Sequence, residues 1–257
     1  MTLNRILLIR TGALGDLIVT LPVLSALKAA APRACLHLLG YPRTLVMAQG
    51  YADSIASIDQ ADWAPTFVQN GRLPRSCVDR INTADLVLSY LPDPDGIFTA
   101  NLRRAGARTV HSFHPHPPPD GSIHIVDHLL SPLSTLHIPA ADPVPRVLLT
   151  REDRQSAEQI LHHQNLADTS PAVIHPGSGG AAKRWPPERF APVADRIARI
   201  QRRDDQHGRC DVAHRIVAVI GVEAEGEIFW PAANPSATKS PVLRVKALIV
   251  LLTASVV

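Results

Sequence analysis

Aromatic residues are scarce in this sequence, and their scarcity limits the kind of core that the chain can build. Phe, Trp and Tyr make up 4% of the 257 residues, whereas hydrophobic residues as a whole make up 46% and charged residues 19%. These proportions are typical of a globular protein and argue against a disordered one. The core is therefore expected to consist mainly of Leu, Ile, Val and Ala.

Cysteine is also rare. Cys35, Cys77 and Cys210 are odd in number, and none belongs to a C-x-x-C pair. This argues against a zinc site and indicates reduced thiols in a cytoplasmic setting. The 12 histidines are scattered, and their densest group lies in the proline-rich stretch 111–119, which is predicted to be a loop rather than a metal site. We therefore expect neither a metal nor a cofactor.

Long apolar runs and dense basic runs are both missing. The run Ile6–Ile9 is too short for a secretory signal and is followed by Arg10, and the run 247–257 is shorter than a membrane span. The net charge of +3 and the pI of about 9.0 favour anionic ligands. The absence of basic clusters argues against a nucleic-acid partner.

What the sequence does contain is an alternation of strand-like and helix-like segments. The continuous apolar run Ile6–Ile9 predicts a buried parallel strand, Leu36–Leu39 and Leu86–Tyr90 are predicted to be further strands, and Leu17–Ala30 has helical spacing. The second half repeats this alternation. The length and the proline-rich stretch 139–145 favour two Rossmann-like domains, residues 1–145 and 146–257, in an α/β fold.

The first glycine-containing turn follows the first predicted strand. Gly12 and Gly15 stand in a G-x-x-G frame, so the G-x-G-x-x-G dinucleotide pattern is absent. Asp16 follows at the predicted start of a helix, at the carboxyl end of the strand, where open parallel sheets bind ligands. Its carboxylate could be a general base, or it could be an ordinary N-cap that satisfies free amides.

A second glycine-rich turn follows the apolar segment Ala172–Ile174. It contains Ser178 and Gly179, continues to Lys183, and precedes a helix start at Pro187. Glycine lets backbone approach a ligand, while free amides, a helix start and a lysine favour an anion such as a diphosphate. A Walker motif is excluded, because no Ser or Thr follows Lys183. The alternative is a plain strand–loop–helix connection with an exposed lysine.

The two motifs together resemble glycosyltransferase family 9, the lipopolysaccharide heptosyltransferases. The resemblance rests on two segments of the sequence: Ile6-Leu7-Leu8-Ile9-Arg10 with Gly12-Ala13-Leu14-Gly15-Asp16 and Thr20-Leu21-Pro22, and His175-Pro176-Gly177-Ser178 with Lys183-Arg184-Trp185-Pro186 and Arg189-Phe190.

The resemblance implies a GT-B fold and a metal-independent, inverting transfer of heptose from an ADP-sugar to a lipopolysaccharide core or related glycan. It implies that Asp16 is the general base, with Gly12 and Gly15 leaving room for ligands beside it. The donor diphosphate would be held by Ser178, Gly179 and Lys183. Such an enzyme is expected in the cytoplasm, at the cytoplasmic face of the inner membrane and in peripheral contact with it.

The sequence departs from the family after about residue 222. Glu225 matches an acidic position near the nucleoside, but the Asp-Ser/Thr-Gly motif that normally follows is absent, so the second domain is expected to be incomplete. This leaves open a catalytically inactive remnant or binding protein of the same family. A nucleotide-dependent oxidoreductase is a weaker alternative, since the dinucleotide pattern is missing.

Overall fold

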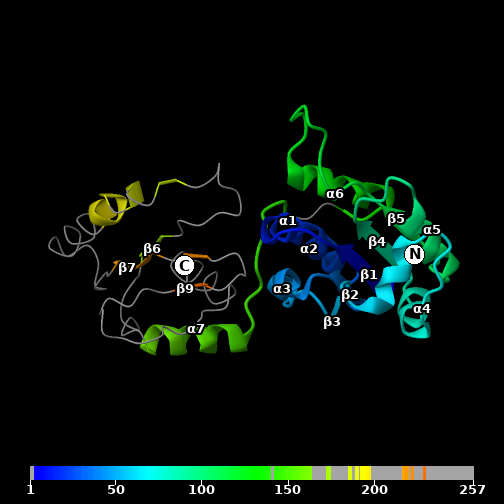
Figure 1. Ribbon diagram of the computed structural model, residues 1–257, viewed down its shortest axis with the longest axis horizontal. Coiled ribbons are helices and arrows are strands. Elements are labelled where there is room, and N and C mark those ends of the chain that lie inside the picture. The colour runs from blue at the N-terminus through cyan, green and yellow to red at the C-terminus, as the bar shows by residue number, and fades with distance from the viewer. Residues whose placement is uncertain are drawn as a thin grey trace. The chain divides into compact units, whose positions relative to one another are not determined.

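The computed structural model describes residues 3–139, 142–163, 172–174, 185–186, 189–190, 192–197, 216–219, 221–222 and 228–229. The contacts of the chain divide it into two compact units, Met1–Leu148 and Leu149–Val257 (Figure 1). The sequence places the corresponding boundary between residues 145 and 146. The two units are described separately below.

A five-stranded, fully parallel sheet forms the centre of the first unit. Its strands lie in the order β3-β2-β1-β4-β5. Their bounds are β1 Arg5–Arg10, β2 Cys35–Gly40, β3 Ser54–Ser57, β4 Leu86–Tyr90 and β5 Val110–Ser112. The chain runs outward from β1 to one edge and then from β4 to the other, so the strand order reverses between β1 and β4. The carboxyl ends of these two strands are where such sheets bind ligands.

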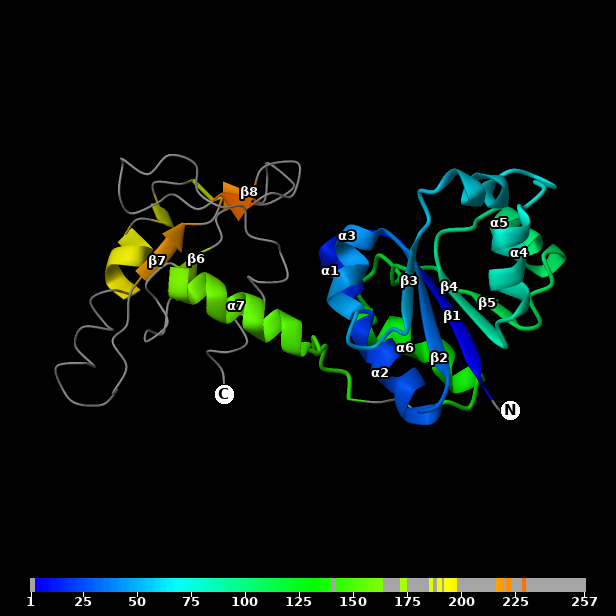
Figure 2. The ribbon, with the colours of Figure 1, turned by 90° about the horizontal axis from the view of Figure 1, so that it is seen from below.

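Helices cover both faces of this sheet. The α-helices are α1 Leu14–Ile18, α2 Leu21–Ala30, α3 Pro42–Leu45, α4 Arg75–Asn82, α5 Ile97–Arg104 and α6 Ile125–Thr135, and short 3-10 helices occupy η1 Val46–Ala48 and η2 Ala61–Phe67. Figure 2 shows α2 and α6 on one side of the sheet and α4 and α5 on the other. This is the doubly wound α/β arrangement that the alternation of segments predicts.

The core of the first unit is built around β1. Its apolar run Ile6–Ile9 is at most 1% exposed, because the strand has a neighbour on each side and helices on both faces. Alternate residues of a strand point to opposite faces, and Leu7 and Ile9 share one apolar cluster with Trp63 and Phe98. Two of the few aromatic residues are therefore used in the centre of the domain.

The segment that follows β1 differs from the sequence prediction. One helix over Leu17–Ala30 is predicted, but the structure has two, α1 and α2, separated at Val19 and Thr20. Thr20 is the N-cap of α2, and Pro22 lies in its first turn, where a missing amide donor has no cost. The earlier start of α1, at Leu14, moves Asp16 into the third helical position. The N-cap of α1 is Ala13, so Asp16 is not the N-cap.

The second unit contributes a further parallel strand pair. Its described elements are α7 Arg151–His163, β6 Ala172–Ile174, β7 Ile216–Val219, β8 Gly221–Val222 and β9 Ile228–Phe229, and residues 192–197 are helical. β6 pairs with β7 in parallel, and β8 pairs with β9 in antiparallel orientation. Helix α7 begins with a reciprocal cap, in which the Thr150 amide donates to the Asp153 carboxylate and the Asp153 amide donates to the Thr150 hydroxyl.

Candidate active site

The Asp16 carboxylate lies at the carboxyl end of the central strand. Three residues connect β1 to α1, and Asp16 follows in the first turn of that helix. Its Oδ2 accepts a hydrogen bond of 2.8 Å from the Ala13 amide, so the carboxylate satisfies one of the free donors at the helix start. The side chain is 34% exposed, which leaves it open to a ligand. Capping and a reactive role are therefore compatible at this residue.

Arg10, the last residue of β1, lies directly behind Asp16. Its side chain is 3% exposed, and its Nη2 lies 3.6 Å from Asp16 Oδ1. Burial lowers the pKa of Arg10 from its usual value, and the nearby Asp16 carboxylate opposes this effect. The partly exposed carboxylate is thus backed by a buried cation from the strand beneath it.

Gly12 and Gly15 have different surroundings. Gly12 has a φ of +119°, which disfavours residues with a side chain, and a Cβ atom there would lie 2.6 Å from Asp16 Oδ2. A Cβ atom on Gly15 would meet nothing within 4 Å. Gly12 therefore makes room for the Asp16 carboxylate itself, whereas the space beside Gly15 is open.

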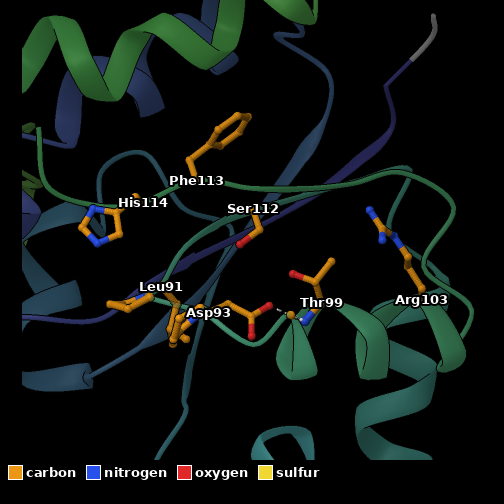
Figure 3. Close-up of a pocket in the computed structure, with 10 residues that line it drawn as sticks. Leu91, Asp93, Thr99, Arg103, Ser112, Phe113 and His114 are labelled. Carbon is orange, nitrogen blue, oxygen red and sulfur yellow. Dashed lines mark hydrogen bonds between the residues drawn. The ribbon is translucent and has the colours of Figure 1, made fainter. Parts of the chain in front are cut away.

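A pocket of about 390 Å³ lies beyond the carboxyl ends of β4 and β5, at the same end of the parallel strands as Asp16 (Figure 3). Asp93 forms part of its wall and caps α5, since its carboxylate accepts from the amides of Phe98 at 3.0 Å and Thr99 at 2.8 Å. Figure 3 shows Asp93, Thr99 and Ser112 around one space, with Arg103 to one side.

Thr99 and Arg103 contribute two of the polar groups that line this pocket. The Thr99 hydroxyl is buried without a hydrogen-bond partner among the described residues. The exposed Arg103 guanidinium also makes no ion pair with the part of the chain that the structure describes. His114, which lies in the proline-rich loop after β5, reaches the same pocket. A hydroxylated ligand would find both donors and acceptors there.

The sequence does not indicate this pocket, because its residues come from separate segments. Asp93 and Gly96 have the composition of a turn, and the stretch 111–119 has that of a loop. The signal that could have found the pocket is topological. Asp93 comes shortly after β4, and Ser112 is the last residue of β5. The carboxyl ends of neighbouring parallel strands lie side by side.

The predicted donor-binding residues Ser178, Gly179, Lys183 and Glu225 lie outside the described residues. The structure does describe what precedes the glycine-rich segment: β6 occupies Ala172–Ile174, and Ile174 is buried. After the glycine-rich segment, the rings of Trp185 and Phe190 are in edge contact, with centroids 5.1 Å apart.

Metal-binding clusters and membrane-spanning helices are both absent from the described residues. No group of three or more His, Cys, Asp and Glu residues in the described ranges could hold a metal ion. No helix within those ranges is long and apolar enough to cross a bilayer.

Solved structures with a similar fold are known. A family 9 glycosyltransferase from Veillonella parvula superimposes with a TM-score of 0.60, at 23% sequence identity over 78% of this chain and 62% of that protein. The chain shares the family 9 glycosyltransferase fold. The E. coli ADP-heptose lipopolysaccharide heptosyltransferase II gives a TM-score of 0.50, at 14% identity over 76% of this chain and 61% of that protein.

The similarity and the parallel sheet of the first unit confirm the predicted α/β fold. The chain spans less than two thirds of the length of these two proteins. No protein-family model matches the chain, and no curated protein matches it in sequence.

Proposed function

We propose that this protein is an inverting glycosyltransferase that uses Asp16 as its general base. The observation that carries the proposal is the Asp16 carboxylate: it is partly exposed, it lies at the carboxyl end of the central strand, and the space beside the neighbouring Gly15 is open. A base for sugar transfer needs an accessible carboxylate in a fixed position. The fold shared with family 9 glycosyltransferases supports the same reaction class.

In the proposed reaction, an acceptor hydroxyl oxygen attacks the anomeric carbon of the donor sugar. Asp16 takes the hydroxyl proton as the new carbon–oxygen bond forms, and the bond from the anomeric carbon to the diphosphate breaks on the opposite face. The nucleoside diphosphate leaves with the bonding electron pair. Attack opposite the leaving group inverts the anomeric configuration, and no metal ion takes part in the proton transfer.

The donor that we propose is ADP-heptose or a similar ADP-sugar. The E. coli protein of similar fold is named as an ADP-heptose lipopolysaccharide heptosyltransferase, and the glycine-rich segment after β6 has the residue types of a diphosphate site. We assign the diphosphate to Ser178, Gly179 and Lys183, whose positive charge would stabilise the leaving group, and the nucleoside to Glu225. The second unit thus supplies the donor site of a GT-B enzyme.

The acceptor that we propose is a lipopolysaccharide core or a related glycan. The pocket after β4 and β5 lies at the same carboxyl ends of the strands as Asp16, and its exposed Arg103 guanidinium could donate to the hydroxyls of a sugar. Because such a core is attached to lipid, the reaction would take place at the cytoplasmic face of the inner membrane.

Donor binding is tested first, by calorimetry with ADP and ADP-sugars. We expect the Lys183→Ala variant to lose binding, because the diphosphate loses its cation, while the control Lys239→Ala, outside both motifs, binds like the wild type. Equal binding by both variants would remove Lys183 from the donor site. A folded wild-type chain that binds neither ADP nor ADP-sugar would contradict the assignment of the donor.

Transfer is then measured with Asp16→Asn and the exposed control Asp59→Asn. The amide keeps the size of the side chain but cannot take a proton, so we expect a loss of about 100-fold or more in the rate of transfer, and no loss in the control. Proton NMR of the product reports its anomeric configuration. A wild-type chain that binds ADP-sugar but never transfers it would instead be a binding protein of the same fold.

A further inference from the structure

One buried side chain connects the elements on which the position of Asp16 depends. The Arg10 guanidinium donates to the Asp16 carbonyl from Nε at 3.3 Å and from Nη2 at 3.1 Å. It also donates to the Thr20 hydroxyl at 3.1 Å and to the Tyr90 carbonyl at 3.3 Å. Arg10 therefore connects the ends of β1 and β4 to α1 and to the start of α2.

The backbone of Asp16 is held from two sides. Besides the two hydrogen bonds from Arg10, its carbonyl accepts a third from the Thr20 hydroxyl at 2.7 Å. Three hydrogen bonds to one carbonyl restrict the rotation of the peptide group. The direction in which the Cα–Cβ bond of Asp16 leaves the helix is therefore restricted as well. The start of the side chain is thereby fixed.

The carboxylate is held at both of its oxygens. Oδ2 accepts from the Ala13 amide at 2.8 Å, and Oδ1 faces Arg10 Nη2 at 3.6 Å, which is an ion pair longer than a hydrogen bond. Oδ1 therefore keeps lone pairs that a substrate hydroxyl could use. Apart from Asp16, the ionisable group that faces Arg10 is the buried Tyr90, so Asp16 is the only carboxylate that balances this buried charge in the described part of the chain.

We propose that Arg10 is a positioning residue for Asp16, which keeps the carboxylate in the orientation that a base requires. If the carboxylate rotated away, the buried guanidinium would lose its counter-charge, and an uncompensated buried charge is strongly unfavourable. Arg10 thus penalises the other rotamers of Asp16 without contacting a substrate. As far as it concerns catalysis, this inference rests on the proposed function.

The shape of arginine, and not only its charge, is required for this role. Its planar fork reaches acceptors in three directions, whereas a lysine ammonium is a compact charge on a flexible stem. Arg10→Lys keeps the counter-charge but cannot reach the Asp16 carbonyl, Thr20 and Tyr90 together. Arg10→Met keeps the apolar stem and removes every donor. The two variants therefore separate the effect of charge from that of geometry.

The matched control is Asn101→Leu. Asn101 is 1% exposed, and its Nδ2 donates to the carbonyls of Pro65, Thr66 and Val68 at 3.2, 2.8 and 2.9 Å. Like Arg10, it is a buried side chain that holds three separate groups, but it lies on α5 and contacts no carboxylate in the described part of the chain. If loss of stability alone caused the effects of Arg10→Met measured below, Asn101→Leu should therefore show the same effects.

The decisive measurement is the water-exchange rate of the Ala13 amide by NMR in the full chain. The Ala13 amide donates to Asp16 Oδ2, so the rate reports the carboxylate orientation without any need for activity. We expect an increase of about tenfold or more in Arg10→Met, since a hydrogen bond to a charged group is lost for part of the time. We expect a smaller increase in Arg10→Lys and none in Asn101→Leu.

An unchanged Ala13 rate in Arg10→Met would overturn the inference. If Arg10→Met does not fold, Arg10→Lys takes its place in the test. An unchanged Ala13 rate in Arg10→Lys would show that the arginine fork is not needed and would also overturn the inference. Where transfer is detected, we expect kcat to fall about tenfold or more in the Arg10 variants, with KM for the ADP-sugar nearly constant. An absence of transfer by the wild type would contradict the proposed function alone, since the Ala13 rate would still decide the role of Arg10.

Discussion

Replacing Gly12 with alanine is expected to destabilise the first unit through the Asp16 side chain. The Cβ atom would lie 2.6 Å from Oδ2 and 3.1 Å from both Cβ and Cγ of Asp16, so the carboxylate must rotate away. Rotation breaks the hydrogen bond from the Ala13 amide, which contributes about 1 kcal/mol at a partly exposed site. The φ of +119° adds about 1–3 kcal/mol of backbone strain for a residue with a side chain. The free energy of unfolding should fall by roughly 2–4 kcal/mol.

Gly15→Ala provides a matched control three residues away. A Cβ atom on Gly15 would have no neighbour within 4 Å, and the residue lies in the first turn of α1. Alanine should therefore leave the free energy of unfolding unchanged or raise it by up to about 1 kcal/mol. The assay is urea unfolding followed by fluorescence of the buried Trp63, with Trp185 and Trp230 replaced by phenylalanine in every variant. If Gly12→Ala stays within about 0.5 kcal/mol of the wild type, the steric reasoning about Asp16 is wrong.

Three further predictions concern the same unit. Asp93→Ala should lower the free energy of unfolding by about 1 kcal/mol, because α5 loses its cap, and Asp93→Asn should lower it less. The hydrogen bond from Lys28 holds the pKa of Asp53 below its usual value, so its contribution is present at neutral pH and is lost as pH falls through that lowered pKa. Urea unfolding should show Asp53→Asn less stable than wild type by about 0.5–1 kcal/mol at pH 7, with the difference closing below about pH 4. Burial hides the Cys77 thiol from reagents and raises its pKa, so little of it is the reactive thiolate. In a Cys210→Ser variant, a thiol reagent should therefore label the exposed Cys35 in the native chain and Cys77 only after unfolding.

The central strands could be predicted from the sequence because burial on both faces leaves a clear pattern. β1 contains the apolar run Ile6–Ile9 and β4 is apolar except for Ser89, and the predicted and observed positions of both strands differ by at most one residue at each end. The division between α1 and α2 could not be predicted from periodicity, since apolar residues continue at helical spacing across Thr20. Only the cap and the proline mark the second start.

The candidate site was predictable in part for a similar reason. Asp16 follows a recognisable strand and glycine turn, so its place at the sheet edge could be inferred. Arg10 could not be assigned a role, because its acceptors come from residues up to 80 positions away. The Thr99 hydroxyl is likewise an ordinary polar group in the sequence, and only the packing of α5 leaves it without a partner among the described residues.

The order of the strands has a consequence for how the site would be lost on heating. Asp16 and Arg10 depend on β1, which has a hydrogen-bonded neighbour on each side, whereas the pocket depends partly on β5, a three-residue strand at the edge of the sheet. Local opening begins at short, weakly paired elements, while central strands open only with the whole domain. The pocket beside β5 can therefore open while Asp16 and Arg10 are still in place.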